Sequence, residues 1–258
     1  MFLARITAAR RADAERRAGE GALDEARTAA RDAPAPRDFH AVLAAPGTSL
    51  IAEVKRASPS AGAIAPETDP VAQARAYEAG GASAISVLTE PEHFQGSLDD
   101  LGAVRASVSL PVLRKDFVCH PLMVWEARAA GADAVLLIVA ALDDAELASL
   151  HTLVLDAGMT PLVEVHDADE VPRALAVGAR IVGINVRNLQ TLEVDPAVTA
   201  RVRPAIPAGI LVVAESGIAD RADVERVEEA GCDAILVGEA LMRTGDPART
   251  IRMLLGRG

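Results

Sequence analysis

The sequence predicts an α/β protein, a (β/α)8 TIM barrel, with a helical extension at its N-terminus. The chain has 258 residues, close to the ~250 residues of one such barrel. From residue 49 onward, short apolar runs alternate with amphipathic stretches, as in parallel sheets built from βα units. Half of the residues are hydrophobic but only 2% are aromatic, so the core must consist mainly of aliphatic side chains. That composition suits parallel strands buried on both faces.

Residues 1–48 precede the first strand, and we expect them to pack on the barrel as part of a single domain, 1–258. They contain two helical patterns separated by the break at Pro34, Ala35 and Pro36. The arginines of the first pattern alternate with acidic residues, which favours a solvated helix face over a nucleic-acid-binding arm. No apolar run has the length of a signal peptide or a membrane span. We therefore expect a cytoplasmic protein.

Eight strands are expected, and an open doubly wound sheet is the alternative fold. Eight evenly spaced units, with no GxGxxG motif after the first strand, favour closure into a barrel. The expected strands cover residues 49–54, 83–88, 111–115, 133–138, 160–165, 180–184, 210–215 and 233–237.

Helix boundaries are marked by short local signals. The pairs Asp69-Pro70 and His120-Pro121 predict helix starts with proline at the first helical position, and Asp143 followed by Glu146 predicts a capping box. Five glycines stand where a helix closes before an apolar strand and predict C-terminal caps with a positive φ; they are Gly81, Gly131, Gly158, Gly178 and Gly231.

The charge and the sparse special residues exclude several functions. A net charge of −11 argues against binding to nucleic acid or an anionic membrane. Cys119 and Cys232 form no CxxC motif and are expected to be structural thiols. The five histidines show no metal-ligand spacing, and no GxSxG motif is present. We therefore expect no metal, no cofactor and no serine nucleophile.

Polar residues gather where the predicted strands end, which is where a β/α barrel places its reactive groups. One such residue could be an ordinary solvated strand end. Several at one mouth are costly to bury unless they pair with one another or with a ligand. The strand-end residues are Glu53, Lys55, Lys115, Glu164, Asn185, Arg187, Glu215 and Ser216.

The two lysines stand out because the chain otherwise uses arginine for positive charge. Of its 26 basic residues, only Lys55 and Lys115 are lysine. Arginine does not lose its proton in proteins, whereas a desolvated lysine can shift its pKa and act as a proton donor. We therefore expect both lysines to take part in the chemistry.

Small residues after the last two strands predict a phosphate site. Gly217 and the pair Gly238-Glu239 let backbone N–H groups approach an anion, as is common after strands seven and eight of a barrel. Ser58 in the first βα loop can add a hydroxyl. Phe94 and Phe117 follow strands two and three, where they would suit an aromatic ring.

These segments together resemble indole-3-glycerol phosphate synthase, a barrel enzyme of tryptophan biosynthesis. The resemblance covers nearly the whole chain and rests on IAEVKRASPSAG, SVLTEPEHFQGS, PVLRKDFV, LVEVHD, GINVRNLQTLEVD, VAESGI and ILVGEALM. It implies closure of the pyrrole ring of a carboxyphenylamino-deoxyribulose phosphate, with loss of carbon dioxide and water. It also implies one phosphorylated small-molecule substrate, and we expect a monomer or a weak homodimer.

The resemblance assigns roles to individual residues. Lys115 would be the general acid, Glu164 the general base, and Lys55 the holder of the substrate carboxylate. The catalytic group would be completed by Glu53 and Asn185. The substrate would also contact Ser58, Phe94, Phe117, Leu136, Arg187, Leu189, Glu215 and Ser216, with Ser58, Gly217, Gly238 and Glu239 around the phosphate.

Departures from the family pattern are confined to two loops. In the first βα loop, Ala61 stands where the family usually has a basic residue, and residues 65–68 lack the usual basic and aromatic pattern. After the third strand, Val118-Cys119-His120 differs from the more common apolar-apolar-acidic run. The alternatives are phosphoribosylanthranilate isomerase, the α subunit of tryptophan synthase, a Schiff-base aldolase, or a barrel that only binds a phosphorylated ligand. The isomerase is disfavoured because it would carry cysteine on strand one, where Glu53 and Lys55 stand.

Overall fold

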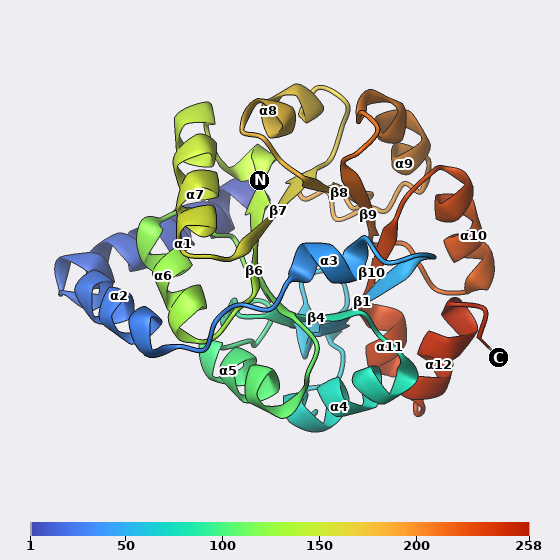
Figure 1. The fold of residues 1–258 in the computed structure, drawn as a ribbon, viewed down its shortest axis with the longest axis horizontal. Coiled ribbons are helices and arrows are strands. Elements are labelled where there is room, and N and C mark those ends of the chain that lie inside the picture. Colours follow the sequence, from blue (N-terminus) through green and yellow to red (C-terminus); the bar gives the residue numbers. More distant parts are fainter. Residues whose placement is uncertain (1, 258) are drawn as a thin grey trace.

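The computed structural model describes residues 2–257 and contains a closed barrel of eight parallel strands (Figure 1). Each strand pairs with its neighbours in chain order, and β1 closes the ring against β10. The strands are β1 (Ser49–Val54), β4 (Ala84–Leu88), β5 (Val112–Lys115), β6 (Ala134–Ile138), β7 (Thr160–Val165), β8 (Ile181–Asn185), β9 (Leu211–Glu215) and β10 (Ala234–Val237). The predicted barrel and its eight strands are thus confirmed, with boundaries within one residue.

Helices surround the barrel, and the first βα loop carries a small hairpin, β2 (Ala57–Ser58) with β3 (Gly62–Ala63). The outer helices are α4 (Pro70–Gly80), α5 (Leu98–Ser107), α6 (Pro121–Ala129), α7 (Asp144–Asp156), α8 (Val171–Ala176), α9 (Ala197–Val202), α10 (Arg221–Glu229), α11 (Glu239–Arg243) and α12 (Pro247–Leu254). Two 3-10 turns follow β6 and α9, at Val139–Ala141 and Arg203–Ala205. Among residues 2–257, no helix is both long and apolar enough to span a membrane.

The predicted helix boundaries are confirmed. Asp69 and His120 cap α4 and α6 with their side chains, each before a proline at the first helical position. Asp143 and Glu146 form the predicted capping box of α7. The five glycines predicted at helix ends all have φ between 78° and 91°. These local signals fix where the helix of each βα unit begins and ends. The strands are parallel, so every strand begins at the same end of the barrel.

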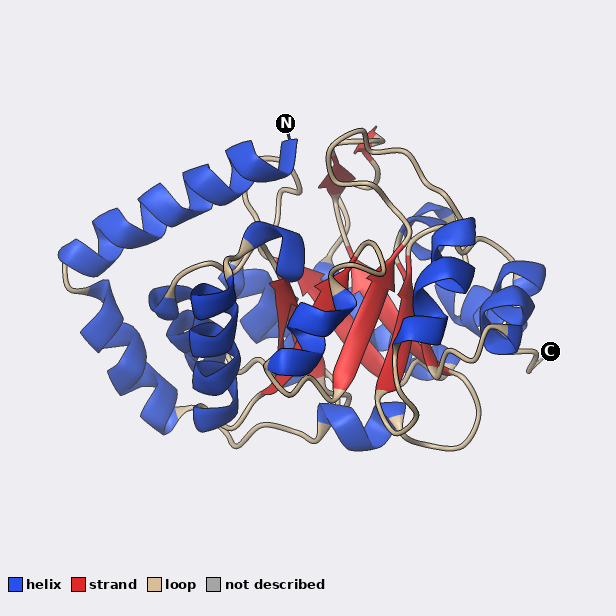
Figure 2. Ribbon diagram, turned by 90° about the horizontal axis from the view of Figure 1, so that it is seen from above, coloured by secondary structure: helices blue, strands red, loops and turns tan. Residues whose placement is uncertain are grey.

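The N-terminal extension contains three helices where two patterns were predicted. They are α1 (Phe2–Gly19), α2 (Ala22–Asp32) and α3 (Phe39–Leu43). Gly21, with φ 99°, divides the segment before the proline break, because a left-handed residue ends one helix and lets the next start in a new direction. Figure 2 shows α1 at the same end of the barrel as the β2–β3 hairpin.

The core has two layers. The larger layer lies between the strands and the outer helices and is mostly aliphatic. The inner layer fills the barrel and includes Ile51, Leu113 and Leu162. Phe39 and Leu43 of α3 belong to this inner layer and are fully buried. They pack beneath the start of β1, so α3 closes the end of the barrel opposite the carboxyl ends of the strands. The carboxyl ends of the strands lie at the other end, where a β/α barrel places its active site.

The interpretation of the α1 arginines as a solvated face is wrong for part of the helix. Arg10 forms an ion pair with Asp116 at 2.6 Å, Arg11 with Glu146 at 2.6 Å, and Arg17 also pairs with Glu126. Arg5 and Arg16 do face solvent. A helix periodicity shows which residues share a face, but both faces of α1 carry charge. The sequence therefore could not show which face meets the barrel.

Candidate active site

A cavity of about 450 Å³ opens at the carboxyl ends of the strands. Every residue predicted for the site lines it, although these residues come from all eight strands and the loops that follow them. They are Glu53, Lys55, Ser58, Phe94, Lys115, Phe117, Leu136, Glu164, Asn185, Arg187, Leu189, Glu215, Ser216, Gly217, Gly238 and Glu239. Barrel closure brings them together because the last inward-facing residue of each strand points into the same mouth.

Lys115 lies at the centre of the polar group, between two carboxylates. Its Nζ donates to Glu164 Oε2 at 2.8 Å and to Glu215 Oε2 at 2.7 Å. Both glutamates are 1% exposed. Burial by itself would lower the pKa of Lys115, but the negative charges of Glu164, Glu215 and Glu53 outweigh it and raise this pKa above its ordinary value. Lys115 is therefore protonated in the absence of substrate and can act as a proton donor.

The two glutamates differ in their electrostatic surroundings. Burial disfavours the charged form of Glu164, but Lys115 and His166 outweigh it and hold the pKa of Glu164 well below its usual range. Burial raises the pKa of Glu215 to about 8, because the attraction of Lys115 is opposed by the neighbouring charge of Glu164. Glu164 thus favours the ionised form, available to accept a proton, whereas Glu215 binds a proton more readily.

Lys55 and Glu53 form a separate pair on β1 and the residue after it. Lys55 Nζ lies 2.9 Å from Glu53 Oε1, so the second lysine has one carboxylate partner where Lys115 has two. A Cβ at Gly238 would lie 2.5 Å from that same Glu53 oxygen. A Cβ at Gly183 would lie 2.1 Å from Glu215 Oε1. Glycine in β8 and directly after β10 therefore provides the space in which the buried carboxylates sit.

Asn185 connects the ends of β8 and β9. Its Oδ1 accepts from Ser216 Oγ at 2.9 Å and from the backbone N–H of Arg187 at 3.0 Å. Ser216 and Gly217 both have positive φ, 70° and 71°. Two successive left-handed residues turn their backbone groups toward one side, a conformation that suits an anion. Ser216 pays a conformational cost there, which marks the turn as functionally constrained.

The first βα loop places Ser58 at the edge of the cavity. Ser58 Oγ accepts from the backbone N–H of Ala61 at 3.2 Å and lies 3.3 Å from Ser60 Oγ. The loop is held by the β2–β3 hairpin and by Ile64, whose N–H donates to the Arg56 carbonyl at 2.8 Å. The hydroxyls of Ser58 and Ser60 thus lie together at the edge of the cavity.

The apolar wall of the cavity includes an aromatic pair. The rings of Phe94 and Phe117 have centroids 6.1 Å apart, and Leu136 and Leu189 pack in the same inner cluster. Phe2 of α1 adds an edge-to-face contact with Phe117 at 6.5 Å. Phe2 was missed from the sequence, because its position over the mouth depends on the path of the whole extension. The wall suits a flat aromatic group.

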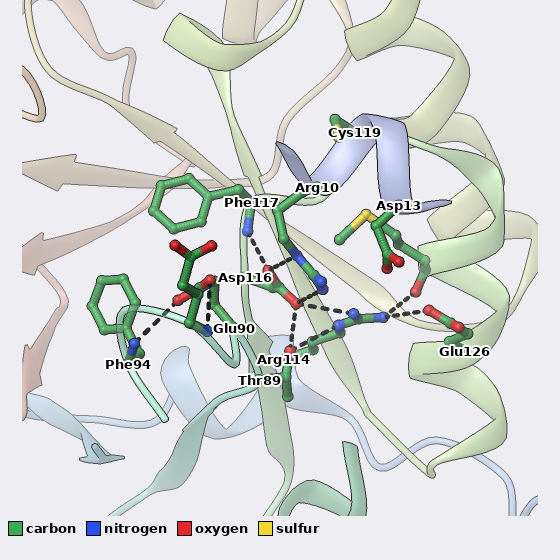
Figure 3. Close-up of polar contacts among 12 residues, drawn as sticks. Arg10, Asp13, Thr89, Glu90, Phe94, Arg114, Asp116, Phe117, Cys119 and Glu126 are labelled. Atoms are coloured by element: carbon green, nitrogen blue, oxygen red, sulfur yellow. Dashed lines mark hydrogen bonds and ion pairs between the residues drawn. The ribbon is translucent and has the colours of Figure 1, made fainter. Parts of the chain in front are cut away.

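Glu90 fixes the loop that carries Phe94. Its carboxylate is 2% exposed and accepts from the backbone N–H groups of Glu92, His93 and Phe94 at 2.7 to 3.1 Å. Figure 3 shows this carboxylate between the two phenylalanine rings and the Asp116 cluster. A buried acid that satisfies three backbone donors gives the loop one conformation, so Phe94 is held in position before any ligand binds.

Asp116, next to Lys115, joins α1 to the barrel (Figure 3). Its carboxylate accepts from Arg10, Thr89 and Arg114 at 2.6 to 3.1 Å, and also from the backbone N–H of Phe117 at 2.8 Å. Burial disfavours its charge, but the two arginines lower the pKa of Asp116 below its ordinary value. The network was not predicted for the site, although the fragment Arg114-Lys115-Asp116 at a strand end was a visible signal.

Both cysteines are buried and have no disulfide partner, as predicted for structural thiols. Burial raises the pKa of each to about 11, so neither is a thiolate at neutral pH. Neither residue lines the cavity.

Comparison with known proteins gives one consistent family. The sequence model described as indole-3-glycerol phosphate synthase matches residues 3–254. The chain is 53% identical to the protein of that name from Mycolicibacterium vanbaalenii and 52% identical to the one from Mycobacterium ulcerans, each over 96% of this chain and 91% of the relative. A thiamine phosphate pyrophosphorylase from Pyrococcus furiosus shares the fold, with a TM-score of 0.59 and 19% identity over 80% of this chain and 93% of that one.

Proposed function

The chain belongs to the indole-3-glycerol phosphate synthase family, and from that premise we propose how its residues divide the work. The chain is a carboxy-lyase of tryptophan biosynthesis. It closes the pyrrole ring of a carboxyphenylamino-deoxyribulose phosphate, releases carbon dioxide and water, and gives indole-3-glycerol phosphate. The observation that carries the assignment of roles is the position of Lys115 between Glu164 and Glu215.

Lys115 is the general acid. A ketone that becomes an alcohol under attack by the aryl carbon needs a proton at its oxygen, and Lys115 is the charged, buried donor at the centre of the cavity. Substrate oxygen competes with the two glutamates for its N–H groups. A positioned acid of this kind is typically worth 10²–10⁴ in rate.

Glu164 is the general base of the later dehydration. Its carboxylate favours the ionised form while the neighbouring Glu215 binds a proton more readily, a separation of pKa values that assigns different roles to two similar groups. Glu215 holds Lys115 and contacts the sugar chain of the substrate, together with Asn185 and Ser216.

Lys55 holds the substrate carboxylate that leaves as carbon dioxide. A carboxylate that is to be lost needs a cation that does not bind it too tightly, and Lys55 already shares its charge with Glu53. The aromatic ring of the substrate lies against Phe94, Phe117, Leu136 and Leu189. Arg187 completes the rim.

The phosphate is bound by the turns after β9 and β10. Backbone N–H groups of Gly217, Gly238 and Glu239 approach it, and Ser58 adds its hydroxyl from the first loop. The positive φ of both Ser216 and Gly217 supports this site. The overall charge of −11 repels anions, so the local donors must supply the attraction.

The domain organisation, the location in the cell and the oligomeric state are proposals as well. We propose a single domain spanning 1–258, a cytoplasmic location, and a monomer or weak homodimer. No nucleic acid is expected as a partner.

The test is a direct assay of ring closure. Purified protein, treated with a chelator and given the deoxyribulose phosphate, is expected to form a product with indole fluorescence. Well-folded protein that gives no such signal would overturn the assignment. Borohydride added with substrate provides the control for Schiff-base chemistry, since the proposed route forms no imine and predicts no covalent adduct on either lysine.

A further inference from the structure

His166 lies behind Glu164, outside the cavity lining. Its Nε2 is 3.2 Å from Glu164 Oε1, and its Nδ1 is 3.5 Å from Glu170 Oε2. The other oxygen of Glu164 is the one that binds Lys115. Four titratable groups therefore form one row that leads away from the substrate cavity: Lys115, Glu164, His166 and Glu170.

Exposure rises along this row. Glu164 is 1% exposed, whereas the side chains of His166 and Glu170 are 14% and 16% exposed. The row thus connects a fully buried carboxylate to the solvent-facing rim of the barrel. Proton exchange between Glu164 and solvent has an obvious path through the imidazole, because its two nitrogens face carboxylates on opposite sides.

The turn after β7 holds the outer carboxylate in place. The backbone N–H of His166 donates to Glu170 Oε2 at 2.7 Å. Asp167 Oδ1 accepts from the N–H groups of Asp169 and Glu170 at 2.9 and 3.1 Å. Glu170 is also the residue from which α8 starts. The imidazole is therefore flanked by Glu164, which Lys115 holds, and by Glu170, which the backbone N–H of His166 holds.

Three polar atoms of this row lack a formed hydrogen bond within the described part of the chain. Glu164 Oε1 and both ring nitrogens of His166 are shielded from solvent, and their contacts have ion-pair distances without hydrogen-bond angles. Buried polar atoms are normally satisfied, so such a group calls for an explanation. A small rotation of the ring forms the bond to Glu164, as a transfer step requires.

The reaction itself creates a need for this path. The substrate carboxylate carries one negative charge and leaves as neutral carbon dioxide, so each turnover takes up one proton. The water released contains the ketone oxygen and two protons, of which one comes from the substrate and one must enter from solvent. Lys115 is enclosed by the substrate and the two glutamates, so its reloading needs a relay.

We propose that His166 is the proton reserve of the site: the imidazolium passes its Nε2 proton to Glu164, which reloads Lys115, and the neutral ring, which still carries its Nδ1 proton toward Glu170, regains a proton from solvent at the vacated Nε2. The inference rests on the proposed roles of Lys115 and Glu164. His166 does not contact substrate and acts only through Glu164, to which it supplies a proton. It is therefore a positioning residue.

The charges around His166 favour its protonated form, as a proton reserve requires. The charged groups that face the ring are Glu164 from β7 and Glu170 from the start of α8, and the nearest cation in the row is Lys115, on the other oxygen of Glu164. Burial lowers the pKa of His166, but the two carboxylates outweigh it and raise this pKa to about 10. When Lys115 gives its proton to substrate, Glu164 loses its main counter-charge, which favours transfer from the imidazolium.

The test is buffer-dependent recovery of a histidine variant. His166→Gln is expected to lower steady-state kcat at least tenfold and to leave KM within twofold, while the first turnover in a single-turnover experiment stays within threefold of wild type. Added imidazole buffer is expected to restore kcat in proportion to its concentration, because a small base can replace the lost reserve. Wild-type kcat is expected to show no dependence on buffer concentration.

Two further variants make the result decisive. Glu170→Gln keeps an oxygen for the His166 N–H, and it is expected to lower kcat three- to tenfold with the same recovery by imidazole. His40→Gln, on α3 at the closed end of the barrel, is the matched control and is expected to behave as wild type.

The relay is wrong if His166→Gln keeps wild-type kcat. It is also wrong if single-turnover and steady-state rates fall equally with no effect of imidazole, since that pattern indicates a structural role. Failure of the proposed function is distinct, because the wild-type protein would then form no indole product at any buffer concentration.

Discussion

Replacing Gly183 with alanine tests whether the position of Glu215 matters for the reaction. The added Cβ would lie 2.1 Å from Glu215 Oε1 and 3.2 Å from its Cδ. Carbon and oxygen atoms in contact need roughly 3.5 Å. The Glu215 carboxylate must therefore move away by more than about 1 Å. The β9 backbone cannot shift to make room for it, because Asn185 and Glu215 remain paired in the sheet.

Two effects of different size follow. Overpacking a buried position costs about 1–3 kcal/mol of unfolding free energy, partly offset by the roughly 0.5–1 kcal/mol gained when glycine in a strand is replaced. A net loss of about 1–2 kcal/mol leaves the protein folded. The 2.7 Å bond from Lys115 to Glu215 is lost, and a misplacement of about 1 Å near reacting groups can cost about 10²-fold in rate. We expect kcat to fall about a hundredfold.

The assay combines indole fluorescence for turnover with urea unfolding for stability. Gly102→Ala is the matched control, because a Cβ there has its nearest neighbour, the Ala130 carbonyl oxygen, at 3.6 Å. That variant is expected to keep full activity and to gain up to about 1 kcal/mol, as for glycine in a helix. A folded Gly183→Ala protein with kcat within twofold of wild type would refute the reasoning, since Lys115 would then work without Glu215.

Three other predictions concern the acid, the α1 anchor and the closed end of the barrel. Lys115→Ala is expected to lower kcat at least a hundredfold while calorimetry still detects binding of the product phosphate; persistent activity would assign the acid role to Lys55. Asp116→Asn removes the carboxylate that pairs with Arg10 and with the buried Arg114 and is expected to cost about 3–5 kcal/mol in urea unfolding. Because the pKa of Asp116 is depressed in the folded protein, its charge stabilises the wild-type fold above the ordinary pKa of about 3.9, and this stabilisation is lost as the pH falls through the lower folded pKa. The variant should therefore lose less unfolding free energy over this pH range. An unchanged slope of unfolding free energy against pH would contradict the assignment. Phe39→Ala is expected to cost about 3–5 kcal/mol and to leave kcat of the folded fraction unchanged, so a large loss of kcat would mean that α3 influences the mouth.

The strands and most helix boundaries could be predicted because they depend on local chemistry. Gly131 and Gly231 end helices by adopting a positive φ, and Asp69 and Asp143 start them by capping free N–H groups. Each signal lies within a few residues of the boundary it sets. Repetition of such units predicted the barrel, since eight parallel strands with evenly spaced crossovers close readily.

The polar residues of the site were also predictable, because barrel topology converts strand ends into one cluster. Glu53, Lys115, Glu164 and Glu215 lie far apart in sequence, yet each is the last or next-to-last residue of a strand. The scarcity of lysine separated Lys55 and Lys115 from general positive charge. The family resemblance then assigned their separate roles, which remain a prediction.

Contacts that cross the fold could be found only in the tertiary structure. Arg10 and Asp116 are 106 residues apart, and their pairing depends on how α1 lies over the barrel. The same holds for Phe2 at the aromatic wall and for the space that Gly183 leaves for Glu215. A side chain's rotamer and its partner are set by the packing of several elements at once, which no local pattern encodes.

The two lysines illustrate which properties the sequence determines and which only the tertiary structure determines. Their residue type and strand-end positions, visible in the sequence, indicated chemistry at the mouth of a barrel. Only the folded chain shows that Lys115 has two carboxylate partners and Lys55 has one. Partner number and burial determine charge and pKa, and these properties belong to the assembled site because each depends on atoms supplied by other strands.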